Sequence, residues 1–186
     1  MRADAARNVH RIIEVAARLI GEDPHAGMNE VAAAAGVSRA TVYRHFATRE
    51  ALIGAIQKQA VEQAERALES SRLDEGSATE ALRRLVATWL DLAERYSLPQ
   101  LATQPGLDTS KATREQRRAT FRQPLVALVE RGQATGEFAA DLPAEWSARS
   151  FGSLVLAGAR AIADGELART AAADLVFRTL IRGLSG

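Results

Sequence analysis

The sequence contains no cysteine, and this absence excludes several kinds of site at once. Disulfide bonds, thiol nucleophiles and thiolate metal ligands all require that residue. Long apolar runs are absent as well: the longest, residues 152–163, includes Arg160 and is too short to cross a bilayer. The amino terminus is charged and lacks the apolar segment of a secretory signal. We therefore expect a soluble, cytoplasmic protein that has no membrane partner.

The sequence also has no large excess of charge of either sign, because 24 basic and 23 acidic residues give a net charge of +1. The first fifty residues hold seven arginines, six acidic residues and all three histidines, whereas the charges of the remainder balance. This bias is too weak to indicate a nucleic-acid partner by itself, although a basic footprint can be local. Hydrophobic residues at 47% and charged residues at 25% are typical of a folded globular protein.

Strand-like alternation of polar and apolar residues is not found, and apolar residues recur at helical spacing instead. Ser77 and Glu80 have the spacing of a capping box at a helix start, and Pro124 is expected to kink the helix around it. We predict an all-α protein of about nine helices, over residues 8–20, 28–35, 39–46, 49–70, 77–96, 97–103, 109–131, 143–165 and 171–181.

Residues 28–46 carry the most informative pattern, which predicts a helix, a tight turn and a second helix. Gly36 can adopt the left-handed backbone that ends the first of these helices. Val37 would fill the corner, and Ser38 can cap the second helix by accepting from its free N–H groups. In that second helix, Val42 and Phe46 form an inward apolar edge. The opposite edge displays Arg39, Ala40, Tyr43 and Arg44, on a helix thin enough to enter the major groove of DNA.

Residues 34–52, AAGVSRATVYRHFATREAL, resemble the helix-turn-helix signature of the tetracycline-repressor (TetR) family. The close resemblance spans about residues 12–56, and it depends on Ala32, Gly36, Val37, Ser38, Thr41, Tyr43, His45, Phe46, Arg49, Glu50 and Leu52. One departure is the Gly27-Met28 pair, which stands where the family usually starts its second helix with a threonine that caps it and binds phosphate. Gly27 can still cap that helix weakly.

The resemblance implies roles for individual residues at a DNA interface. Arg39 and Ala40 occupy base-reading positions, where an arginine can bind guanine and an alanine can touch a thymine methyl group. Asn29 occupies a second base-reading position, and Arg44 can read a base or a phosphate. Ser38, Thr41, Tyr43, His45 and Arg49 complete the expected DNA-binding set, with Thr41, His45 and Arg49 at phosphate-contacting positions.

The resemblance also implies a second, helical domain that binds a small molecule and forms a homodimer. We expect the DNA-binding domain at residues 1–50, a long linking helix at about 49–70, and the ligand-binding and dimerisation domain at 51–186. The aromatic residues of this body could line a pocket for a small hydrophobic or amphipathic effector, or simply form its core. They are Trp89, Tyr96, Phe121, Trp146 and Phe151.

The helix expected at 143–165 is apolar on two sides, so it must be covered twice. One cover would be its own domain, and the other a partner subunit joined through the last helix. The predicted dimer interface comprises Leu154, Ala157, Gly158, Ala161, Leu175, Val176, Thr179 and Leu180. Arg149 and Arg160 share a face of the same helix, and the sequence leaves open whether they face an anionic ligand or solvent.

Taken together, these features predict a ligand-responsive transcriptional repressor that binds a palindromic operator as a homodimer. An activator, or a regulator controlled by a protein partner without a small-molecule ligand, remains the alternative. An enzyme is disfavoured, because no activated nucleophile, paired-carboxylate site or phosphate-binding loop is found. Glu22 and His25 have the spacing of a metal pair, but Pro24 interrupts the helix between them, so we expect neither a metal nor a cofactor.

Overall fold

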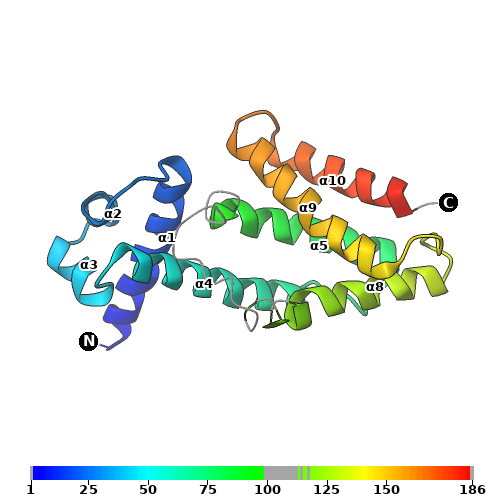
Figure 1. The fold of residues 1–186 in the computed structure, drawn as a ribbon, viewed down its shortest axis with the longest axis horizontal. Helices are drawn as coiled ribbons and strands as arrows, with labels where there is room; N and C mark the ends of the chain where they lie inside the picture. The colour runs from blue at the N-terminus through cyan, green and yellow to red at the C-terminus, as the bar shows by residue number, and fades with distance from the viewer. Residues whose placement is uncertain (1, 99–112, 114, 117, 185–186) are drawn as a thin grey trace. The chain divides into compact units, whose positions relative to one another are not determined.

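The structure, a computed structural model, describes residues 2–98, 113, 115–116 and 118–184, and this part of the chain is helical without strands. The all-α prediction is confirmed. The described residues form eight α-helices and one π-helical turn (Figure 1): α1 (Arg2–Glu22), α2 (Met28–Ala35), α3 (Arg39–His45), α4 (Arg49–Ser70), α5 (Ala78–Arg95), η1 (Arg118–Arg122), α8 (Gln123–Ala134), α9 (Ala144–Ala163) and α10 (Arg169–Leu184). Most of the short helix predicted at 97–103 lies outside the described residues, as does the stretch 109–112.

Two compact units make up the chain, and each draws on more than one stretch of sequence. The first combines residues 1–62 with 95–108, and the second combines 63–94 with 109–186. Helices α4 and α5 therefore each contribute to both units. The boundary predicted at residue 50 falls within the first unit.

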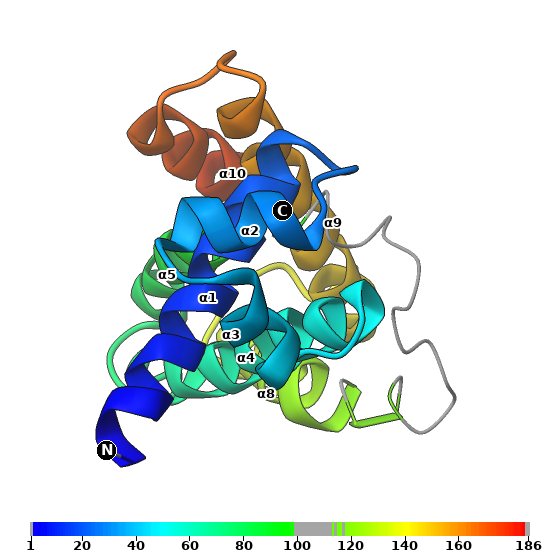
Figure 2. The same cartoon turned by 90° about the vertical axis from the view of Figure 1, so that its left-hand side faces the viewer.

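The first unit is built on an apolar stripe of α1. Ile12, Ala16 and Ile20 recur every four residues and are almost fully buried, at 0%, 0% and 1% exposure. Helix α1 packs on α2, and α2 packs on α3. Apolar residues of α2, α3 and α4 are buried in the same unit, among them Val31 and Ile53. Figure 2 shows the long helix α1 and the short helices α2 and α3 lying at angles to one another rather than running parallel. This arrangement holds α3 with one edge inward and the other free.

The second unit packs α5, α8, α9 and α10 around a separate core. Leu85 and Leu90 of α5, Leu128 of α8 and Val155 of α9 are each at most 2% exposed. Gly158 allows α9 to approach α5 and α10 closely, since a β-carbon at this position would lie 3.1 Å from Leu90 Cδ2 of α5 and 2.8 Å from Val176 Cγ2 of α10. None of the described helices is long and apolar enough to span a membrane.

Candidate nucleic-acid interface and aromatic cluster

The turn between α2 and α3 is fixed by local hydrogen bonds. Gly36 has φ 65°, which an L-residue with a side chain adopts only at a cost, and its N–H donates to the carbonyls at the end of α2. The Val37 N–H donates to Ala32 O at 3.0 Å. Ser38 Oγ then accepts from the Thr41 N–H at 3.1 Å and caps α3. The conformation of Gly36 and the Ser38 cap match the turn predicted from the sequence, whereas Val37 is half-buried rather than a buried plug at the corner.

Helix α3 presents its two edges as the pattern predicts. Val42 and Phe46 are buried, at 0% and 6% exposure, and they anchor the helix to the core. The Tyr43 side chain is 43% exposed, and the Arg39 guanidinium carbon lies 5.9 Å from the centre of its ring. The outer edge thus combines a cation with an aromatic ring, and its exposed residues are Arg39, Ala40, Tyr43 and Arg44.

The remaining residues expected at DNA lie around this edge. Asn29 is exposed in the first turn of α2, beside Gly27, which caps that helix without a side-chain hydrogen bond. Thr41 and His45 are half-buried, and the hydroxyl of Thr41 is paired with that of Ser38 at 2.8 Å. All but one of the expected DNA-contacting residues therefore lie together, on α2, on α3 and at Ser38, the cap of α3.

The exception is Arg49, at the start of α4. Its Nε donates to Ala26 O at 3.1 Å and its Nη2 to Pro24 O at 2.7 Å, so the guanidinium joins α4 to the loop that precedes α2. The free N–H groups of α4 also have acceptors nearby, since Thr48 Oγ1 accepts from the Ala51 N–H at 3.1 Å. The backbone N–H of Glu50 and the Thr48 hydroxyl lower the pKa of the Glu50 carboxyl, which places a negative charge at this terminus. A phosphate role for Arg49 stays a prediction.

In the second unit, three of the five aromatic residues expected at the effector pocket form a cluster. The ring of Trp89 on α5 lies 5.5 Å from that of Phe121 on η1, at an interplanar angle of 82°. It lies 5.9 Å from the ring of Phe151 on α9, at 74°. Edge-to-face pairs of this kind are favourable for aromatic rings. The Trp89 Nε1 atom is buried and has no hydrogen-bond partner among the residues that the structure describes.

The π-helical turn that carries Phe121 has a cause in the sequence. Pro124 follows it and has no N–H to donate to the carbonyl four residues earlier, so the α-helical pattern cannot continue through this point. Where the sequence predicts a kink, the structure has the π-helical turn Arg118–Arg122.

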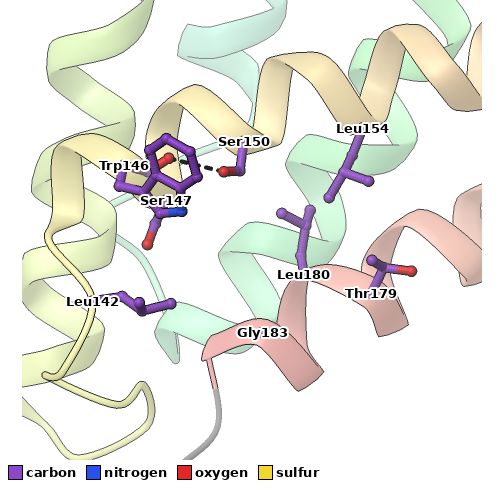
Figure 3. Close-up of a pocket in the computed structure, with 8 residues that line it drawn as sticks. All are labelled: Leu142, Trp146, Ser147, Ser150, Leu154, Thr179, Leu180 and Gly183. Atoms are coloured by element: carbon purple, nitrogen blue, oxygen red, sulfur yellow. Dashed lines mark hydrogen bonds between the residues drawn. The ribbon is translucent and has the colours of Figure 1, made fainter.

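The other two aromatic candidates lie elsewhere. Tyr96 belongs to the first unit, is 1% exposed, and its hydroxyl accepts from Gln59 Nε2 at 3.1 Å. Trp146 is 59% exposed on α9, and its backbone carbonyl accepts from Ser150 Oγ at 3.1 Å. Trp146 lines a small cavity of about 140 Å³ between α9 and α10, whose lining residues are drawn in Figure 3. That volume is well below the roughly 300 Å³ at which small-molecule pockets begin.

The residues expected at the dimer interface divide between the two sides of α9 and α10. Gly158, Val176 and Leu180 are buried within the unit. The remainder lie on the outside or at its edge: Ala157, Leu175 and Thr179 are exposed, and Leu154 and Ala161 are half-buried. Arg149 and Arg160 are both exposed, so in a single chain both lie on the solvent side of α9.

Several interactions were not predicted from the sequence, because their partners are distant along the chain. Glu137 accepts from the N–H groups of Ala78 at 3.0 Å and Thr79 at 2.9 Å, and so caps α5 beside the predicted Ser77–Glu80 capping box, which is confirmed. These bonds lower the pKa of Glu137 from 4.5 to about 2. Among the residues that the structure describes, no group of three histidine or acidic side chains could hold a metal ion.

Comparison with known proteins places the chain among bacterial regulators. The family model for bacterial regulatory proteins of the tetR family matches residues 12–56. The transcriptional repressor LfrR of Mycolicibacterium smegmatis is 29% identical over 182 residues, covering 96% of this chain and 90% of the relative. The transcriptional regulator NfxB of Pseudomonas aeruginosa is 29% identical over 176 residues, covering 94% and 93%. The crystal structure of LfrR in complex with proflavine superposes with a TM-score of 0.79 at 26% identity, covering 97% of this chain and 98% of that one.

Proposed function

Because this chain belongs to the tetR family of bacterial regulatory proteins, and is thus a transcriptional regulator, we propose that it is a homodimeric repressor released from its operator by a small molecule. The observation that carries the proposal is the exposed edge of α3, where Arg39 and Tyr43 stand together on a helix capped by Ser38. The relatives with which it aligns over almost its whole length are regulators rather than enzymes.

In this proposal, α3 enters the major groove and its outer edge reads the operator. Arg39 binds a guanine, Ala40 touches a thymine methyl group and Tyr43 contacts the sugar-phosphate backbone. Asn29 reaches an adenine from the start of α2. Arg44, Thr41, His45 and the Ser38 hydroxyl make the remaining contacts, and Arg49 is considered separately in the Discussion.

Dimerisation through the outer face of α9 and α10 is supported by the apolar surface left there. Two large hydrophobic residues are exposed on this face: Trp146 of α9 at 59% and Leu175 of α10 at 48%. The cavity beside Trp146 is lined by Leu154, Thr179 and Leu180 of the predicted interface, and it has room for one inserted side chain. A symmetric dimer presents two copies of α3 about one DNA turn apart, which requires a roughly palindromic site.

The effector site of the proposal is the aromatic cluster around Trp89. The relative LfrR was crystallised with proflavine, a flat aromatic molecule, which supports an aromatic effector for this chain as well. A ligand that favours one arrangement of the dimer over another lowers operator affinity by the coupling free energy, typically about 1–3 kcal/mol.

The decisive experiment is to select binding sites for the purified protein from random duplex DNA and then to titrate salt. We expect a palindromic sequence, with affinity that falls steeply as salt rises because phosphate contacts release counterions. Tyr43→Ala should abolish the enrichment. Arg39→Ala should relax the preference at one base pair in each half-site by about 1–3 kcal/mol. Arg149→Ala removes an equal charge from exposed α9 and serves as the matched control.

Two outcomes would change the proposal. If no sequence is enriched even at low salt, the DNA-reading role of α3 is refuted. If an operator is found but no small molecule alters its affinity, the chain is an activator or a partner-controlled regulator instead. A reporter gene placed behind the selected operator separates repression from activation.

A further inference from the structure

The buried indole N–H of Trp89 donates no hydrogen bond to any residue that the structure describes, which is uncommon in folded proteins. A buried donor without an acceptor loses its hydrogen bonds to water and receives nothing in return. Phenylalanine at this position would make the same kind of ring contacts without that loss. The unpaired N–H therefore calls for a partner that the described residues do not supply.

The surroundings of Trp89 indicate what that partner would be. Its ring meets the rings of Phe121 and Phe151 edge to face, and the three come from separate elements, α5, η1 and α9. Phe121 is carried by a π-helical turn, a rare geometry that occurs often at functional sites. Faces and edges of aromatic rings are complementary to a further flat aromatic molecule.

The acidic residues that follow Trp89 on α5 form ion pairs. Asp91 and Glu94 follow Trp89 on α5, and both are bound by Arg169 of α10, at 2.6 Å and 2.9 Å. They lie two and five residues beyond Trp89, which places them about 160° and 140° from it around the axis of α5, so they do not share its face. The indole N–H, in turn, is a neutral donor that takes an acceptor with a free lone pair.

We propose that Trp89 Nε1 is a subsite for an uncharged hydrogen-bond acceptor, a carbonyl oxygen or an unprotonated ring nitrogen, on a flat aromatic effector packed against Phe121 and Phe151. This inference rests on the proposed function and adds to it the chemistry of the effector. It predicts that a ligand of the same outline without the acceptor binds less tightly, and only because of Trp89.

The test compares two probes and two proteins. Acridine, at a mildly alkaline pH, carries a ring nitrogen with a free lone pair, and N-methylacridinium has the same outline with that lone pair blocked. Trp89→Phe keeps an aromatic ring but removes the N–H. Affinities come from the fluorescence of the probes. We expect Trp89→Phe to weaken acridine about fivefold to tenfold, the loss of one neutral hydrogen bond, and to change N-methylacridinium by less than about twofold. The positive charge of N-methylacridinium does not affect this comparison, because each probe is compared with itself in the native protein and in Trp89→Phe.

A second measurement does not need the variant to be well folded. The chain has two tryptophans, so a nitrogen-proton NMR spectrum of the native protein has two indole signals. The spectrum of Trp89→Phe, or of Trp146→Phe if the former does not fold, assigns them. Acridine should shift the Trp89 N–H signal strongly downfield, and N-methylacridinium should not.

The outcomes separate this inference from the proposed function. Equal losses for both probes in Trp89→Phe, an unmoved indole signal, or no binding of acridine at all would overturn the subsite. If acridine binds through Trp89 but does not release a fluorescent operator duplex, the subsite stands and release by an effector fails.

Discussion

Arg49→Lys tests whether this arginine positions the loop before α2 or binds a phosphate of DNA. The substitution keeps the positive charge, but an ammonium group is a single point that cannot donate to two separated carbonyls as the guanidinium does. The native side chain donates to Ala26 O and Pro24 O, both in the loop that leads into α2. Arg49 thereby positions the start of α2, where Gly27 supplies no side-chain cap and Asn29 is exposed.

The size of the effect follows from these two bonds. Each hydrogen bond from a charged donor contributes about 1.5–3 kcal/mol when buried, and Arg49 is only half-buried, so we take the lower end. Lysine can retain one of the two bonds. We therefore expect a loss of about 1–2 kcal/mol in the free energy of unfolding, which is a fall of roughly 2–8 °C in Tm for a chain of this size.

The assay is thermal unfolding without DNA, followed by operator binding over a range of salt. Arg18→Lys, an exposed arginine on α1, is the matched control and should leave Tm unchanged. In operator binding, we expect Arg49→Lys to lose affinity with an unchanged salt dependence. An unchanged Tm in Arg49→Lys, together with full operator affinity, would refute the positioning role. If Arg49→Gln then reduced the slope of log affinity against log salt by about 0.9, a direct phosphate contact would replace it.

Three further predictions concern the scaffold and the dimer. Glu137→Gln should lower Tm at neutral pH. The difference in Tm between the variant and the native protein should disappear as the pH falls from about 5 towards 2, because the pKa of Glu137 is about 2 in the folded protein and 4.5 in the unfolded one, and its stabilising contribution is lost on protonation. A difference in Tm that does not depend on pH would contradict the capping role. Gly21→Ala should destabilise the first unit by about 1–3 kcal/mol, since the new β-carbon would lie 2.6 Å from Ser97 Cβ. Adding Ser97→Gly, which also relieves a φ of 47°, should restore Tm, and failure to do so would show that the clash is not the cause. Leu175→Glu should convert the proposed dimer to monomers in sedimentation experiments. Leu156→Glu is the control, because Leu156 is exposed on the row of α9 that carries Arg149 and Arg160, and it should leave the dimer intact. If both variants dissociate the dimer, the interface lies elsewhere.

The features that could be predicted from the sequence are those set by near neighbours. The turn at Gly36, the cap at Ser38 and the Ser77–Glu80 capping box each involve residues within five positions of one another. The bounds of α4 were predicted closely for the same reason, because its first residues follow Thr48, which caps it. Helix α1 begins earlier than predicted, at Arg2 rather than residue 8, since its first turns have no apolar stripe by which to recognise them.

Features that depend on distant partners could not be predicted in this way. Arg49 finds its acceptors 23 and 25 residues away, and Glu137 caps a helix 58 and 59 residues before it. Nothing in a local pattern distinguishes an arginine that binds a phosphate from one that binds a carbonyl. The family resemblance assigns Arg49 to phosphate, while the geometry of this chain favours the loop.

The aromatic residues show the same limit in another form. Composition identifies five candidates for one pocket, but helical geometry separates them. Trp146 and Phe151 are five residues apart on α9, which turns them about 140° from each other around the helix axis. One therefore faces the core beside Trp89, at 3% exposure, and the other faces outward at 59%. Because α9 is apolar on both of these sides, a single sequence pattern serves two purposes: the inner row closes the proposed effector site, and the outer row supplies the surface on which a second copy of the chain would dock. An effector that pushes on Phe151 would thus act on the helix that carries Trp146, which links the proposed pocket directly to the proposed dimer interface.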